Sequence, residues 1–163
     1  MPLSMSQASV PLFLRALRNL SEILKKGEAH PDAASFAEAR LAPDMLTLVG
    51  QVQRASDAAK GCAARLSATP APSFADVEKT MPELQERIQK TIDYLKSVPT
   101  SAIDGSEERE INFKTGPNEY KFTGVQYLQG FAIPNFFFHV TTAYAILRHK
   151  GVALGKMDFL GRN

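Results

Sequence analysis

The chain has 163 residues, of which 44% are hydrophobic and 22% are charged, and its formal net charge is +2. This length fits one domain spanning residues 1–163, with the composition of an ordinary globular protein. The small charge, with no run of Lys and Arg longer than Lys25-Lys26, argues against a partner that is nucleic acid or an anionic membrane.

The chain has one cysteine, Cys62, which excludes an intramolecular disulfide and any metal site built from several cysteines. Its alanine-rich helical surroundings favour a small buried side chain over a reactive thiol. No stretch of 18 or more apolar residues predicts a transmembrane helix, and the N-terminus lacks the pattern of a signal peptide. We therefore expect a cytoplasmic protein without a membrane partner.

Two long helices are predicted in the first half of the chain. The first runs from Gln7 to Lys26, where apolar residues recur at three- and four-residue steps, and Gly27 ends it. A connector from His30 to Ala42, in which Pro31-Asp32 opens a short helix, leads to a second helix from Pro43 to Ala68. The many alanines of this second helix indicate close packing, and the prolines that follow it predict a loop over Thr69 to Ser73.

The third helix begins at Thr80, because Thr80-Met81-Pro82-Glu83 fits a capping box, and it ends before Pro99. Polar and apolar residues then alternate in Glu110 to Lys114 and in Glu119 to Phe122, with Gly116-Pro117-Asn118 between them. This pattern predicts a short β-hairpin that lies against the helices, since an isolated hairpin is marginally stable in water.

A fourth helix is predicted from Thr123, its cap, to His149. Pro134 removes one backbone hydrogen bond and is expected to kink this helix one turn before His139. The apolar residues of the tail, Val152 to Asn163, predict that it packs back on the body. Four long helices, mostly short connections and one hairpin indicate a mainly all-α protein, an up-down four-helix bundle with a short β-hairpin before the last helix.

Three polar residues lie on the apolar stripe of the fourth helix. At about 100° per residue, Asn135, His139 and Thr142 share a narrow sector with Leu128, Phe131 and Ile146. Buried polar groups are costly unless they find partners. This sector therefore predicts a binding pocket lined by Asn135, His139 and Thr142, and no residue stands out as catalytic.

His139 allows three interpretations. It is a core histidine satisfied by Asn135 or Thr142, a residue that hydrogen-bonds a small-molecule ligand, or a metal ligand. A transition-metal site normally needs three protein ligands, and the other histidines, His30 and His149, are badly placed. We therefore expect no metal cofactor, and if one binds, His139 is its ligand.

On the second helix, Gln53, Asp57 and Lys60 follow one flank of the stripe, while Ser56 faces the core. Asp57 and Lys60 are spaced for an intrahelical ion pair. The alternative is that Gln53 or Asp57 reaches His139 across the bundle and lines the same pocket.

The outer face of the fourth helix is also apolar, so it must be covered. The hairpin and the tail are candidates, and so is a second subunit. We predict a homodimer whose interface includes Phe137, Val140 and Tyr144.

Several segments resemble one known family: Leu41-Ala42-Pro43-Asp44-Met45, the stretch from Gln51 to Lys60, Pro134-Asn135-Phe136-Phe137-Phe138-His139, Ala143 to Arg148, and Gly155 to Gly161. By these segments the chain resembles an uncharacterised, domain-of-unknown-function branch of the DinB/YfiT-like four-helix bundle superfamily. The resemblance implies a bundle that is often dimeric, in which three histidines commonly bind a divalent metal, one on the second helix and two in an HxxxH motif on the fourth. Some members are metal-dependent transferases or isomerases that use a thiol.

The chain departs from this pattern at two of the three metal positions. His139 matches the second histidine of HxxxH, but Asn135 occupies the first position, and only Gln51 or Gln53 is available on the second helix. We therefore expect a protein that binds a small molecule near His139 without a complete metal triad. The alternatives are a divalent-metal-dependent, thiol-dependent transferase or isomerase and a structural, dimeric interaction module.

Overall fold

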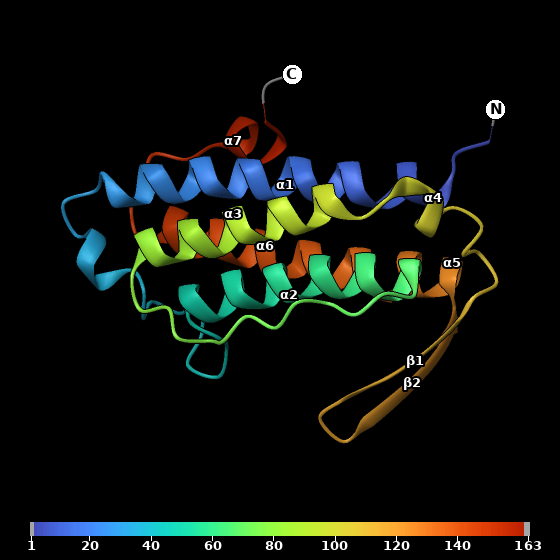
Figure 1. Ribbon diagram of the computed structural model, residues 1–163. Coiled ribbons are helices and arrows are strands. Elements are labelled where there is room, and N and C mark those ends of the chain that lie inside the picture. The colour runs from blue at the N-terminus through green and yellow to red at the C-terminus, as the bar shows by residue number, and fades with distance from the viewer. Residues whose placement is uncertain (1, 162–163) are drawn as a thin grey trace.

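Four long helices lie side by side in the computed structural model, which describes residues 2–161 (Figure 1). They are α1 (Met5–Glu28), α2 (Leu48–Ser67), α3 (Met81–Ser97) and α6 (Ile133–His149). Both α1 and α2 pack against α3 and α6, and the buried apolar residues of the four helices form one continuous core. The predicted mainly helical four-helix bundle is confirmed.

Local caps set where these helices begin. The Ser4 hydroxyl accepts from the backbone of Gln7, so α1 begins two residues before the predicted start. Thr47 caps α2, which begins at Leu48 rather than at Pro43. The predicted capping box of Thr80 and Glu83 opens α3. Each cap satisfies backbone N–H groups that the first turn leaves without partners.

Gly27 lies inside α1, so the prediction that it ends the helix is wrong. The helix continues to Glu28 and is capped by Ala29. A β-carbon at Gly27 would lie 3.2 Å from a Leu147 side-chain atom and 3.3 Å from the sulfur of Met81. The glycine therefore allows α6 and the start of α3 to approach α1 closely.

Within this bundle, the helices do not simply alternate in direction along the chain. In Figure 1 the colours of α2 and α3 both advance from left to right, so these two helices run the same way. Residues 69–80, which we call the strap, connect the end of α2 to the start of α3 and run back along α2 (Figure 1). The 20-residue α2 is about 30 Å long. An extended chain the length of the strap is about 40 Å long, enough to cross it.

The β-hairpin forms where it was predicted. Strands β1 (Glu110–Thr115) and β2 (Asn118–Thr123) pair antiparallel, with Thr115 opposite Asn118. Gly116 has a φ of 55°, the positive value that the first position of a two-residue hairpin loop favours. The hairpin projects from one end of the bundle beside α2 (Figure 1). The ring of Phe113 lies 5.0 Å from that of Phe131, which anchors the hairpin to the helices.

The predicted last helix is interrupted one turn before His139. It consists of α5 (Gly124–Tyr127), a π-helical turn η2 (Leu128–Ala132) and α6. The Ile133 N–H donates to the carbonyl of Leu128, five residues earlier, and Pro134 follows in the first turn of α6. Proline has no N–H to donate, and the wider turn accommodates this loss.

From Gly124 to His149 this helix is long and apolar enough to cross a membrane by length and composition. Core helices of helical bundles meet the same criterion, and α6 packs along α2. The expected absence of a membrane partner stays a prediction.

Three short helices complete the chain: η1 (Ala33–Ser35), α4 (Thr100–Ile103) and α7 (Lys156–Leu160). The predicted short helix after Pro31-Asp32 is η1. As predicted, the tail packs back on the body over residues 152–161, while Arg162 and Asn163 lie outside the described residues. Val152 and Leu154 are buried, and α7 lies on the outer side of α1 (Figure 1).

Candidate functional site

A cleft of about 480 Å³ lies between the hairpin, α2, and the chain from α5 to the start of α6. Its walls combine four aromatic rings, three cationic side chains, one carboxylate, an amide and an imidazole. The residues that line it are Leu46, Arg54, Asp57, Ala58, Arg65, Phe113, Lys114, Thr115, Tyr120, Tyr127, Phe131, Ala132, Asn135 and His139. Three of the five predicted binding residues, Asp57, Asn135 and His139, therefore line one cleft.

His139 is held by Gln51, a buried residue of α2. The distance from its Nδ1 to the Gln51 Oε1 is 2.8 Å. The Gln51 amide nitrogen donates to the carbonyl of Leu46 at 3.4 Å, which assigns Oε1 as the acceptor toward the imidazole. Nδ1 then carries the proton, and Nε2 keeps its lone pair. His139 is half-buried and lines the cleft, so it offers a hydrogen-bond acceptor there.

The imidazole is kept neutral near pH 7. Burial lowers the pKa of His139, and the nearby positive charge of Arg54 lowers it further. Both effects disfavour the imidazolium. A neutral imidazole in a fixed tautomer is suited to hydrogen bonding with a ligand and to accepting a proton from it.

The other predicted residues lie in different surroundings. Thr142 is buried, does not line the cleft, and donates to the carbonyl of Phe138 in its own helix at 2.7 Å. Gln53 faces the strap, where its amide donates to Glu78 at 2.9 Å. Because Gln51 and Gln53 are about 200° apart around the helix axis, only Gln51 reaches His139.

Asp57 lies at the edge of the cleft, but its carboxylate is committed elsewhere. It pairs with Lys60 at 3.3 Å, as its spacing predicted, with Arg54 at 3.0 Å and with Arg87 at 3.0 Å. The alternative in which Asp57 reaches His139 across the bundle is therefore wrong, because His139 bonds to Gln51 instead.

Arg87 is an organising residue that the sequence analysis missed. Its side chain is 1% exposed, and it pairs with Asp57, Asp76 and Glu78. The sequence contained a signal, because Leu84, Arg87 and Thr91 share the buried face of α3 at three- and four-residue steps. A guanidinium on a core stripe indicates buried carboxylate partners.

The residues at the expected metal positions do not fit a divalent metal ion. Gln51 and Asn135 supply amides where the resembled superfamily has histidines, and the Gln51 oxygen is bonded to His139. Within residues 2–161, no group of three or more His, Cys, Asp or Glu side chains is arranged to hold a metal. A site for a transition metal needs about three protein ligands of nitrogen, sulfur or carboxylate type.

The predicted interface residues lie partly under the chain's own tail. The ring of Phe159 in α7 lies 6.3 Å from that of Phe137 and 6.1 Å from that of Tyr144. Val140 is 2% exposed, so it has almost no surface to offer a second subunit. Phe138, beside His139, is 54% exposed. The homodimer stays a prediction, which light scattering checks against twice the chain mass of 17.9 kDa.

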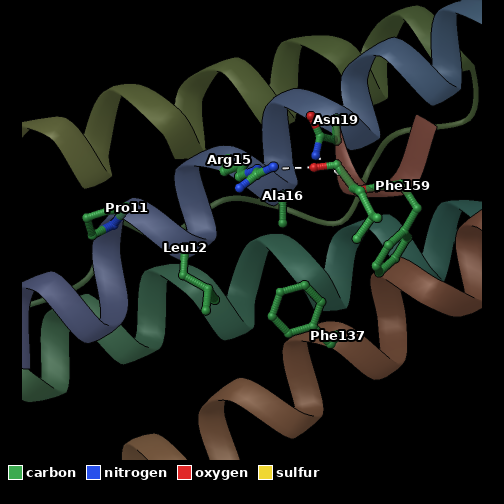
Figure 2. A pocket seen from close by; sticks show the side chains of 8 residues that line it. Pro11, Leu12, Arg15, Ala16, Asn19, Phe137 and Phe159 are labelled. Carbon is green, nitrogen blue, oxygen red and sulfur yellow. Dashed lines mark hydrogen bonds between the residues drawn. The ribbon is translucent and has the colours of Figure 1, made fainter. Parts of the chain in front are cut away.

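A second hollow, of about 400 Å³, lies between α1, α6 and α7 (Figure 2). Leu12, Ala16, Phe137 and Phe159 form its apolar walls. Its polar groups fasten the tail, since Arg15 Nε donates to the Leu160 carbonyl and Asn19 donates to that of Phe159. None of the described residues that line this hollow is suited to acid–base chemistry, so the cleft at His139 is the stronger candidate.

Comparison with known proteins supports the resemblance noted in the sequence. Residues 5–160 match a family described as "Domain of unknown function (DUF1993)". The chain is also similar to the crystal structure of a DinB family member protein from Shewanella denitrificans, with 36% sequence identity and a TM-score of 0.87. The match covers 97% of this chain and 92% of that one. No curated protein matches the chain.

Proposed function

The chain belongs to the DUF1993 family and has the fold of a DinB family member, and on that premise we propose that it binds a small molecule in the cleft around His139, through its own side chains. The observation that carries the proposal is the relay from the Leu46 carbonyl through Gln51 to His139. It fixes the ring and leaves one nitrogen as an acceptor on the cleft wall.

The rest of the cleft suits a small organic ligand. Its volume lies in the range of ligand pockets, and such pockets combine apolar walls with a few polar groups that fix orientation. Tyr120 and Phe131 supply apolar surface, with ring centroids 5.2 Å apart. Asn135, one helical turn from His139, adds an amide that both donates and accepts.

A fragment screen tests this proposal. We expect some fragments to raise the melting temperature of the wild type and to shift amide resonances of residues around the cleft. A ligand at about 100 times its dissociation constant stabilises a protein by about 2.7 kcal/mol. His139→Gln should weaken these fragments, while His149→Gln, a matched change at an exposed residue of the same helix, should not.

Fragments that bind His139→Gln as well as the wild type, or that shift only resonances away from the cleft, contradict the proposal. Metal analysis of protein purified without a histidine tag supplies a second test. Near-stoichiometric zinc, nickel, manganese or iron that disappears in His139→Ala overturns a metal-free site and favours the metal-dependent transferase or isomerase of the superfamily.

A further inference from the structure

One of the three cationic side chains of the cleft, Arg65, is not balanced by a carboxylate among the described residues. Arg54, Arg65 and Lys114 line it, and Asp57 is the acidic residue among the described lining residues. Arg54 is paired with Asp57 at 3.0 Å, and Lys114 lies 3.7 Å from Glu119 on the exposed hairpin. Arg65 has no ion-pair partner among residues 2–161, and its side chain is half-buried.

Arg65 is held in place by neutral groups. Its guanidinium carbon lies 4.5 Å from the centroid of the Phe113 ring and 5.6 Å from that of Tyr127, and its Nη1 donates to the Tyr127 hydroxyl at 3.2 Å. Burial raises the pKa of Tyr127 to about 12. The phenol therefore stays protonated, and it orients the charge of Arg65 without neutralising it.

Gly61 makes room for this position. A β-carbon at Gly61 would lie 2.3 Å from Arg65 Nη1. The guanidinium thus lies back over the bare backbone one turn earlier in α2, next to the hairpin. A larger residue at this position would push Arg65 away from Phe113.

From this arrangement we infer that the ligand of the cleft is a small organic carboxylate with a flat apolar body, and that Arg65 binds its carboxylate. This inference rests on the proposed function. A guanidinium presents parallel N–H donors that match a carboxylate, and charge-assisted hydrogen bonds are about twice as strong as neutral ones.

The aromatic residues determine the shape of the ligand body. Phe113 and Tyr120 are stacked, with centroids 5.2 Å apart and planes 16° apart, and Phe131 closes the group at one side. Flat rings bind such surfaces by stacking or edge-to-face contact. The Nε2 of His139 and the Asn135 amide, on the helix that forms another wall, are then available for a second polar group of the ligand.

Three probes of nearly equal shape test this: 1-naphthoate, 1-naphthamide and 1-naphthylmethylamine, titrated into labelled protein and followed by amide shifts around the cleft. We expect the carboxylate to bind about tenfold tighter than the amide, and the amine to bind weakest. Arg65→Gln should bring the carboxylate-to-amide ratio close to one. Arg148→Gln, at an exposed arginine of α6, should leave the ratio unchanged.

Gly61→Ala is the second variant, because it displaces the guanidinium while keeping its charge. It should reduce the ratio, in a protein whose circular dichroism matches the wild type. Equal binding of carboxylate and amide at the cleft, weakened by His139→Gln, overturns the carboxylate inference but leaves the proposed function standing. Binding of none of the three probes at the cleft overturns this inference, and failure of the fragment screen as well contradicts the proposed function.

Discussion

On the two sides of α2, charged and polar side chains have different kinds of partners. Toward the strap, the charges of Asp57, Lys60, Arg87 and Glu78 are joined in one network. Toward the hairpin, Arg65 has no ion-pair partner among residues 2–161 and lies against aromatic rings, and the Nε2 of His139 is an acceptor on the cleft wall. Polar groups that satisfy one another stabilise a structure, whereas those left open on a cleft wall are available to a ligand.

The strap side is built to hold an extended segment. Lys60 donates to the Pro72 carbonyl at 3.0 Å and lies 3.9 Å from the centroid of the Phe74 ring. Arg87 donates to the Ala75 carbonyl at 3.1 Å, and Arg54 pairs with Asp76. These contacts fasten the strap along its length, so we expect changes on this side to alter stability and changes on the cleft side to alter binding.

The largest expected effect is that of Arg87→Met on stability. Removing the guanidinium takes the cation from Glu78 and leaves Asp57 with Lys60 and Arg54, and breaking a buried ion pair costs about 3–5 kcal/mol. Because Asp57 is partly exposed, we expect the lower end of that range in urea unfolding followed by circular dichroism. Arg54→Met, at a 39% exposed side chain, should cost less than about 1 kcal/mol. Equal losses from the two variants would remove the distinction between the strap network and surface pairs.

The pH dependence of the strap side sharpens the comparison. Burial alone raises the pKa of Glu78, but hydrogen bonds from Gln53, from its own backbone and from Arg87 together lower it below its ordinary value of 4.5. Its contribution to stability is therefore complete above about pH 4.5 and is lost as the pH falls toward the lowered value. In urea unfolding between pH 3 and 7, the free energy of unfolding should fall less at low pH for Glu78→Gln than for the wild type. Glu86→Gln, at an exposed residue of α3, should match the wild type.

On the cleft side, stability should begin to fall at a higher pH than it does on the strap side. The pKa of His139 is lowered in the folded protein, by burial first and by Arg54 second. The unfolded chain then binds more protons below about pH 6.5, so stability is full above that pH and declines as the pH falls through it. His139→Gln should flatten this part of the curve, measured by urea unfolding between pH 5 and 8. An unchanged slope in the variant would show that the imidazole is not desolvated as described.

A small effect on stability is expected for Arg65→Gln. The change removes one hydrogen bond to Tyr127 and a cation–π contact, which together contribute about 1 kcal/mol or less at a half-buried site. The same variant should abolish the preference for a carboxylate probe. A loss as large as that of Arg87→Met would instead make Arg65 a structural residue and weaken the contrast between the two sides of α2.

Features governed by nearby residues were predictable from the sequence. The capping boxes at Thr80 and Thr123 and the hairpin around Gly116 depend on groups within a few residues of one another, and the structure has all three. Pro134 likewise predicted an irregular helix, because proline has no N–H and so removes a hydrogen bond to a residue in the preceding turn. The prediction that Gly27 ends the first helix was wrong, because glycine also occurs inside helices where neighbouring helices approach closely.

What the sequence by itself determined is which residues form helices and which faces of those helices are buried, because both follow from local hydrogen bonding and the helical period. The tertiary structure alone decided which neighbour each face meets. In the tertiary structure Gln51 bonds to His139, whereas Gln53 bonds to Glu78 in the strap. The strap runs back along α2 so that α2 and α3 run the same way (Figure 1), and Asp57 pairs with Arg87. Periodicity separates inside from outside but carries no information on partners distant in sequence, and the partners decide which polar groups are satisfied and which remain open.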